Sequence, residues 1–149
     1  MFATKIFFCD NDFLSRKTIK ILLDKIQNTD ILGEFDKTEE LILQLKLQTP
    51  DIVIYNLQSN KLNDIIRIKD ILKRNPNVKV IITSTYEDIK TIAVAFSLGA
   101  IAFLPKRSLS VSNLSNAINY SKKNNHYLSR GSLYKMEDLN KMIQLNYSN

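Results

Sequence analysis

The sequence has very little of the residue types on which several common functions depend. It contains one cysteine, Cys9, one histidine, His126, and no tryptophan. A single cysteine excludes an internal disulfide and fits a reducing cytoplasm, where we expect the protein to be located. A single histidine argues against a histidine-based metal site or a catalytic triad. We interpret Cys9 as a small buried hydrophobic residue and His126 as an exposed residue of the tail.

Glycine and long apolar runs are also scarce. The three glycines, Gly33, Gly99 and Gly131, form no G-x-G pattern, so the sequence lacks the loop that usually binds a flavin or nucleotide phosphate. No apolar run reaches the roughly 18 residues of a membrane-spanning helix. The apolar stretch at the N-terminus is too short for a signal peptide. We therefore expect no membrane partner.

The composition otherwise fits one globular domain with an uneven charge. Of the 149 residues, 44% are hydrophobic and 24% are charged. Residues 1–105 carry 14 basic and 13 acidic side chains, whereas residues 106–149 carry 7 basic and 2 acidic ones. The net charge of +6 therefore comes mainly from the last third. This excess indicates either an acidic partner or nucleic acid, or simply a solvated basic helix.

Strand and helix patterns alternate along the first 124 residues. The expected strands are Lys5–Cys9, Ile31–Phe35, Ile52–Tyr55, Val78–Thr83 and Ala102–Leu104. Helix patterns follow them at Phe13–Gln27, from Thr38, at Asn63–Arg74, around Ile89–Phe96 and from Ser110. Thr38 and Ser110 are expected to cap the N-termini of their helices, and Gly99 the C-terminus of another. The pattern predicts an α/β fold, a flavodoxin-like doubly wound sheet of five parallel strands covered on both faces.

The last 25 residues lie outside this alternation. A stripe of apolar residues predicts one further helix that would serve as a docking or dimer surface: Leu133, Met136, Leu139 and Ile143. The preceding segment, Asn124–Arg130, is polar and is expected to be irregular. We therefore expect a domain over residues 1–124 and a C-terminal tail or linker helix over residues 125–149.

Polar residues stand at the ends of four of the expected strands. They are Asp10, Asn11 and Asp12, then Asn56, then Ser84 and Thr85, and finally Lys106. The carboxyl ends of parallel strands meet at one edge of a sheet, and buried polar groups cost free energy unless they are paired. We therefore expect a shared site. Asn56 is its most informative member, because a carboxylate there could accept a phosphoryl group or hold a metal, whereas an amide does neither well.

In order and spacing, four stretches of the chain resemble the receiver domain of bacterial two-component response regulators. They are Lys5–Asp12, Asp51–Leu57, Val80–Thr85 and Leu98–Lys106, within a resemblance that covers about residues 4–124. The resemblance implies a role for each matching position. It places the acidic pair at Asp10 and Asn11, the phospho-acceptor at Asn56, the switch hydroxyl at Ser84, the aromatic switch residue at Phe103 and the invariant lysine at Lys106.

The chain departs from the family pattern at the residues that bind Mg²⁺ and accept the phosphoryl group in the family. Receivers hold Mg²⁺ with the carboxylates of the acidic pair and the acceptor, and a histidine kinase phosphorylates that acceptor. Here Asn11 and Asn56 replace two of the three carboxylates, only Asp10 remains, and Asp12 lies one position out of register. Because Mg²⁺ prefers several hard oxygen ligands, we expect no metal and no cofactor, leaving open only a weak Mg²⁺ contact at Asp10.

The invariant lysine offers a different way to balance the pocket. We expect Lys106 to pair with Asp10 and to donate a hydrogen bond to the Asn56 carbonyl, which would give a metal-free site. Pro105 precedes this lysine and Arg107 follows it, at the position where the family usually has proline. The loop after the fifth strand is therefore expected to differ from the family pattern.

These features predict an atypical receiver that is not an enzyme. It would act in signal transduction and transcription regulation through phosphorylation-independent protein contacts, either fixed in one state or switched by something other than phosphate. The expected partner is another protein or a second copy, bound through the fourth helix, fifth strand and fifth helix, or through the first and fifth helices. DNA would be bound only through an output domain absent from this chain.

The segment after the last domain helix bears on that output domain. Tyr127–Ser129 looks like the linker of LuxR-type regulators, which continue into a helix-turn-helix domain. Residues 125–149 are too few to build such a DNA reader. We therefore expect either a truncated regulator or a gene without the output domain.

Alternatives remain for the function and for single residues. A flavodoxin-like cofactor-binding protein or enzyme would fit the fold, but the acidic loop after the first strand would repel a phosphate. Phosphotransfer with Asp10 or Asp12 as a substitute acceptor would require an acceptor that does not lie on the third strand. Phe103 is either plain sheet packing or a reporter of the switch, and Tyr86 either fills the phosphate-side cavity or caps the following helix.

Overall fold

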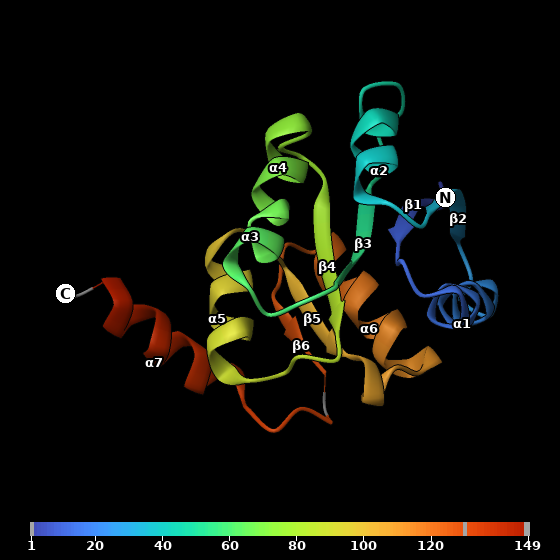
Figure 1. The fold of residues 1–149 in the computed structure, drawn as a ribbon. Coiled ribbons are helices and arrows are strands. Elements are labelled where there is room, and N and C mark those ends of the chain that lie inside the picture. The colour runs from blue at the N-terminus through green and yellow to red at the C-terminus, as the bar shows by residue number, and fades with distance from the viewer. Residues whose placement is uncertain (1, 130, 148–149) are drawn as a thin grey trace.

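Six parallel strands form one sheet in the order β2-β1-β3-β4-β5-β6 (Figure 1). The computed structural model describes residues 2–129 and 131–147. The strands are β1 Thr4–Cys9, β2 Thr29–Phe35, β3 Ile52–Leu57, β4 Lys79–Ser84, β5 Ala102–Pro105 and β6 Tyr127–Leu128. The predicted doubly wound parallel sheet is confirmed, with one strand more than expected.

Helices cover both faces of this sheet. They are α1 Phe13–Asp24, α2 Thr38–Leu45, α3 Leu62–Ile65, α4 Arg67–Arg74, α5 Ile89–Ser97, α6 Val111–Lys122 and α7 Met136–Tyr147, with a short 3-10 turn at Lys106–Ser108. Helices α1 and α6 pack on one face, and α2, α3, α4 and α5 pack on the opposite face, where α7 packs against α5. The helix expected over Asn63–Arg74 is divided into two, α3 and α4, at Ile66.

The central strands are apolar because both of their faces are buried. Side chains alternate along each strand, so that Phe7 and Val53 join the core beneath α2–α5, whereas Ile6 and Ile54 join the core beneath α1 and α6. Every residue of β3 is buried. Full burial of such a side chain stabilises the fold by about 1.5–3 kcal/mol, so the two cores hold the strand ends rigidly in place.

The sixth strand corrects the expectation for Asn124–Arg130, of which Arg130 lies outside the described residues. The N–H of Tyr127 donates to the carbonyl of Ile101 at 3.0 Å, which adds β6 to the edge of β5. The buried ring of Tyr127 contacts Tyr120, and its hydroxyl donates to Asn113 Oδ1 at 2.9 Å. A strand of two residues is too short to show a period of two in the sequence.

The ends of the helices were predicted with mixed success. Ser110 caps α6 as expected, since its hydroxyl accepts from the N–H of Asn113 at 3.0 Å. Gly99 follows α5 with a φ of +114°, a conformation that a glycine adopts without steric cost. The cap expected from Thr38 is wrong, because its hydroxyl instead forms a hydrogen bond of 2.8 Å with the Tyr55 hydroxyl.

The predicted tail helix is present as α7 and packs against α5. Leu139 is fully buried and lies in the same core as Phe96 of α5. Leu133, which was expected in the same stripe, precedes the helix and is exposed. In the part of the chain that the structure describes, no helix is long and apolar enough to cross a membrane.

Candidate functional site

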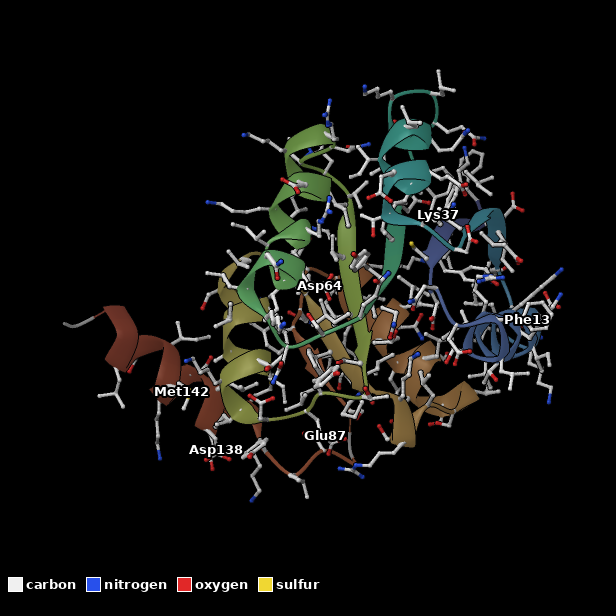
Figure 2. The ribbon with its side chains drawn as sticks, viewed as in Figure 1. Phe13, Lys37, Asp64, Glu87, Asp138 and Met142 are labelled. Carbon is white, nitrogen blue, oxygen red and sulfur yellow. The ribbon has the colours of Figure 1, made fainter. Side chains whose placement is uncertain are left out.

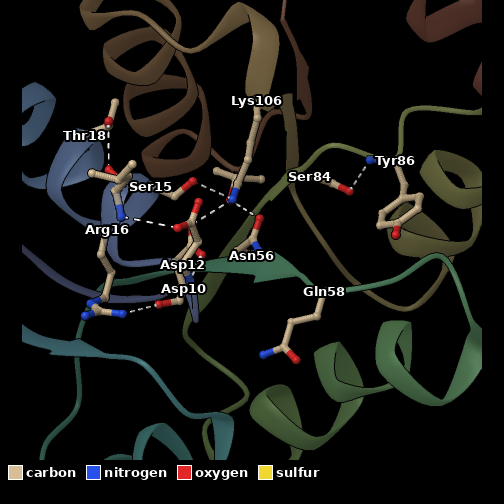
Figure 3. A network of polar contacts seen from close by, with 12 residues as sticks. Asp10, Asp12, Ser15, Arg16, Thr18, Asn56, Gln58, Ser84, Tyr86 and Lys106 are labelled. Carbon is tan, nitrogen blue, oxygen red and sulfur yellow. Dashed lines mark hydrogen bonds and ion pairs between the residues drawn. The ribbon is translucent and has the colours of Figure 1, made fainter.

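Three strand ends bring Asp10, Asn56 and Lys106 together at the carboxyl edge of the sheet (Figure 3). Asp10 follows β1, Asn56 lies next to the end of the adjacent strand β3, and Lys106 follows β5. The ammonium of Lys106 lies 3.0 Å from Asp10 Oδ2. The two side chains are 17% and 3% exposed, so water screens this ion pair only weakly.

The two oxygens of the Asp10 carboxylate have different partners, a backbone N–H for one and the Lys106 ammonium for the other. Its Oδ1 accepts a hydrogen bond of 2.9 Å from the N–H of Asp12. Its buried Oδ2 has no hydrogen-bond donor aligned with it, so its partner is the Lys106 ammonium at ion-pair distance. The guanidinium of Arg16 donates to the Asp10 backbone carbonyl at 2.9 Å. The site therefore contains one buried carboxylate balanced by one ammonium.

Asn56 is 6% exposed and finds its partner on the neighbouring strand. Because Asn56 stands opposite Thr83 in the β3–β4 register, the Thr83 hydroxyl donates to Asn56 Oδ1 at 3.3 Å. The hydrogen bond expected from Lys106 to Asn56 is not formed; the Lys106 ammonium lies between Asp10 and Ser15, and donates to Ser15 Oγ at 2.8 Å. Sequence reasoning missed both Thr83 and Ser15, because their roles depend on strand register and helix phase.

The two other residues of the loop after β1 do not join this ion pair. Asn11 is exposed. Asp12 is the N-cap of α1, where its Oδ1 accepts from the N–H of Leu14 at 3.3 Å. A carboxylate used as a helix cap is already committed to a structural role, which argues against Asp12 as a substitute phosphoryl acceptor.

The residues expected to form the switch are buried on or near β4 and β5. Ser84 is fully buried, and its Oγ accepts from the N–H of Tyr86 at 2.8 Å. Phe103 is also fully buried and packs in the core beneath α5. The ring of Tyr86 lies on the far side of Ser84 from Asn56 (Figure 3). The helix cap considered for Tyr86 is supplied by Asp88, which accepts from the N–H of Thr91 at 3.1 Å.

A network of hydrogen bonds fixes the loop that follows Asn56. Asp64 Oδ2 accepts from the N–H groups of Gln58 and Ser59 at 2.7 and 2.8 Å. The hydroxyl of Tyr55, next to Asn56 in β3, links Asp64 Oδ1 at 3.5 Å to the Thr38 hydroxyl at 2.8 Å. Burial raises the pKa of Tyr55, so its phenol stays protonated as a hydrogen-bond donor. Beyond the residue types, no pattern in the sequence indicates this network.

The thiol of Cys9 is buried directly before this site. Burial, followed by the charge of Asp10 and other carboxylates, raises the pKa of Cys9 to about 12. A thiol reacts through its thiolate, so the side chain is chemically inert near neutral pH. This supports its interpretation as a hydrophobic residue of the core.

The residues at this edge do not fit a resident Mg²⁺ ion. Mg²⁺ prefers several hard oxygen ligands in near-octahedral geometry. The site offers one carboxylate, and the Lys106 ammonium already lies against its Oδ2. Among the described residues, no group of three or more histidines, cysteines, aspartates and glutamates could hold a metal ion. We therefore derive no step through a metal.

Comparison with known proteins identifies the family. The profile of the response regulator receiver domain matches residues 6–119. The sensory transduction protein LytT of Bacillus cereus is 30% identical over 102 residues, which are 68% of this chain and 41% of that protein. A protein-glutamate methylesterase/protein-glutamine glutaminase of Pseudoalteromonas atlantica is 27% identical over 106 residues, or 70% of this chain and 28% of that protein. The chain thus spans less than half the length of these curated relatives.

Solved structures share the fold. A LuxR-family two-component response regulator from Aurantimonas aligns with a TM-score of 0.78 at 18% identity, covering 99% of both chains. The isolated receiver domain of RcsB from Salmonella enterica serovar Typhimurium, solved with phosphomimetic BeF3-, aligns with a TM-score of 0.76 at 19% identity. That match covers 86% of this chain and 94% of the other. At these identities, the likeness concerns the fold alone.

Proposed function

The chain belongs to the response regulator receiver domain family, and we propose that it is an atypical receiver whose signalling does not depend on phosphorylation. The observation that carries the proposal is the neutral Asn56 in a buried pocket whose one carboxylate, Asp10, is paired with Lys106. Receiver domains act in two-component signalling, so the protein remains a signalling module. Its states would be set by contacts with other proteins.

The chemistry of the pocket supports this proposal. A carboxylate can attack a phosphoryl group as a nucleophile, whereas the amide of Asn56 is neutral and accepts a hydrogen bond from Thr83. Asp10 is balanced by Lys106, and Asp12 caps α1. Because Asn11 and Asn56 are neutral, two charges that a metal would have to neutralise are absent from the pocket.

The family and its relatives support a proposal for the wider role. Transcriptional regulators from Bacillus and Brevibacillus are among the curated proteins that match this chain. We propose that the protein acts in transcription regulation, in the cytoplasm, through a protein partner or a second copy of itself. DNA would be bound by an output domain outside residues 1–149. We assign no enzymatic activity to this chain, although methylesterases also share the receiver domain.

The test of the proposal is covalent labelling. The protein is incubated with acetyl phosphate and Mg²⁺ beside a receiver that retains its acceptor aspartate, and both are examined by intact mass spectrometry. We expect the mass of one phosphoryl group on the control and none on this chain. In parallel, beryllofluoride with Mg²⁺ should leave the melting temperature unchanged. A stable adduct on the wild-type chain would overturn the proposal and direct attention to Asp10 as the acceptor.

A further inference from the structure

Arg107 joins three segments of the chain that meet at the carboxyl edge. Its Nε donates to both carboxylate oxygens of Glu87, at 2.8 and 2.9 Å, and its Nη2 lies 2.7 Å from Glu87 Oε1. The same Nη2 donates to the backbone carbonyl of Gly131 at 2.7 Å. Glu87 lies between β4 and α5, and Gly131 lies between β6 and α7. One guanidinium thus connects the loop after β4, the turn after β5 and the C-terminal segment.

The C-terminal segment is closely seated on the turn that carries Arg107. A Cβ atom at Gly131 would lie 3.1 Å from the Cβ of Ser108, so this position has little room for a side chain. The hydroxyls of Ser108 and Ser129 form a hydrogen bond of 2.9 Å. These contacts bring the Gly131 carbonyl to the guanidinium, so the interaction depends on the local fit of the backbone as well as on charge.

The segment held in this way leads directly into α7. Helix α7 begins at Met136, five residues after Gly131, and packs against α5, with Leu139 buried in the core that includes Phe96. From this contact α7 runs outward from the rest of the molecule (Figure 1). Glu87 stands just before α5, at the lower edge of the molecule in Figure 2, where the C-terminal segment also passes. Arg107 therefore links Glu87, just before α5, to Gly131, in the segment that leads to α7. Helix α7 in turn packs against α5.

We propose that Arg107 and Glu87 form a latch that keeps α7 docked on α5. While the latch is closed, α7 covers part of α5, and a change in the loop after β4 that withdraws Glu87 releases the C-terminal segment and uncovers both helices. Arg107 is thus a positioning residue that couples the loop beside Ser84 to the tail. This coupling is independent of whether Asn56 accepts phosphate.

The strength of the contact suits a latch better than a permanent clamp. The side chains of Arg107 and Glu87 are 48% and 19% exposed, and the hydrogen bonds to Glu87 raise the pKa of Arg107, which stays charged. Ion pairs at such an accessible position change a local equilibrium by about two- to fivefold. The planar, two-pronged guanidinium adds direction, because lysine cannot reproduce the two contacts at once.

Hydrogen exchange followed by mass spectrometry on the full chain tests the latch. Arg107→Gln and Glu87→Ala open it from opposite ends, and Arg74→Gln and Glu40→Ala are controls at exposed positions of α4 and α2. We expect amides over residues 133–145 to exchange about two- to fivefold faster in each latch variant, with β1 and β3 unchanged. The double variant should exchange no faster than Arg107→Gln, because that substitution already removes the contact with Glu87 together with the hydrogen bond to Gly131.

Two results would overturn the inference. One is unchanged exchange over residues 133–145 in both latch variants. The other is a double variant in which exchange speeds up by the product of the two single-variant accelerations. That result would show that Arg107 and Glu87 act separately. Salt supplies a further readout that a purely packing role would not move, since raising the ionic strength should speed exchange of α7 in the wild type and not in Arg107→Gln.

Discussion

Replacing Lys106 by methionine tests the electrostatic balance on which the site depends. The substitution keeps most of the aliphatic stem and removes the ammonium, leaving Asp10 Oδ2 buried without its partner. Breaking a buried ion pair from one side typically costs about 3–5 kcal/mol. Asp10 keeps the hydrogen bond from the N–H of Asp12, and Lys106 is 17% exposed, so we expect a smaller loss of about 2–3 kcal/mol.

The measurement is the free energy of unfolding in urea at neutral pH, with Lys69→Met on the exposed side of α4 as the matched control. The double variant Asp10→Asn, Lys106→Met removes both charges and should be more stable than Lys106→Met alone, because no uncompensated carboxylate remains. The reasoning would be refuted if Lys106→Met were as stable as the control. It would equally fail if the two single losses added in the double variant, since the pair would then not be coupled.

Three further substitutions or conditions probe the neighbourhood of this pair. Asn56→Asp should lower the free energy of unfolding by about 1 kcal/mol in metal-free buffer, because a second carboxylate joins Asp10; calorimetric titration should still show weak Mg²⁺ binding, since Asn11 remains neutral. Tyr55→Phe should cost about 1 kcal/mol in urea unfolding and speed exchange over residues 57–64, because the link between Thr38 and Asp64 is lost; unchanged exchange there would contradict it. The native Cys9 thiol, with its pKa raised from 9.0 to about 12, should resist iodoacetamide at pH 8 and react only after unfolding. Because the unfolded thiol ionises first, stability should fall as pH rises from about 9 towards 12; a flat profile would refute the burial argument.

The strands, and the polar residues at their ends, could be predicted because a strand buried on both faces is a continuous apolar run in the sequence. Ile52–Tyr55 and Val78–Thr83 are examples, and both lie within observed strands apart from the first residue of the second. Since parallel strands end at one edge, the meeting of Asp10, Asn56 and Lys106 also followed from topology. The pairing of Lys106 with Asp10 joins opposite charges at the same edge of the sheet, although β3 and β4 lie between β1 and β5.

The details of the site depended on positions that the sequence pattern does not specify. Thr83 meets Asn56 because of the register between β3 and β4, and a shift of one residue would turn its hydroxyl to the other face. Ser15 reaches Lys106 because of the phase of the first turn of α1. Thr38 is of a residue type that favours a helix cap. Its hydroxyl instead forms a hydrogen bond with the Tyr55 hydroxyl, which is buried and needs a partner. In each case the contact depends on tertiary structure, and at Thr38 it also overrides a local preference.

The side chains at the carboxyl edge form one electrostatic arrangement. A pocket with three carboxylates needs an external cation in addition to its lysine, because like charges in a buried site raise each other's free energy. With Asn11 and Asn56 neutral, a single Lys106 balances a single Asp10, and the Thr83 hydroxyl satisfies the amide. The polar groups of Asp10, Asn56 and Lys106 are thus partnered by side chains of the chain itself. The loop after β4 is held separately by Arg107, so the contacts of Arg107 with Glu87 and Gly131 do not involve Asp10, Asn56 or Lys106.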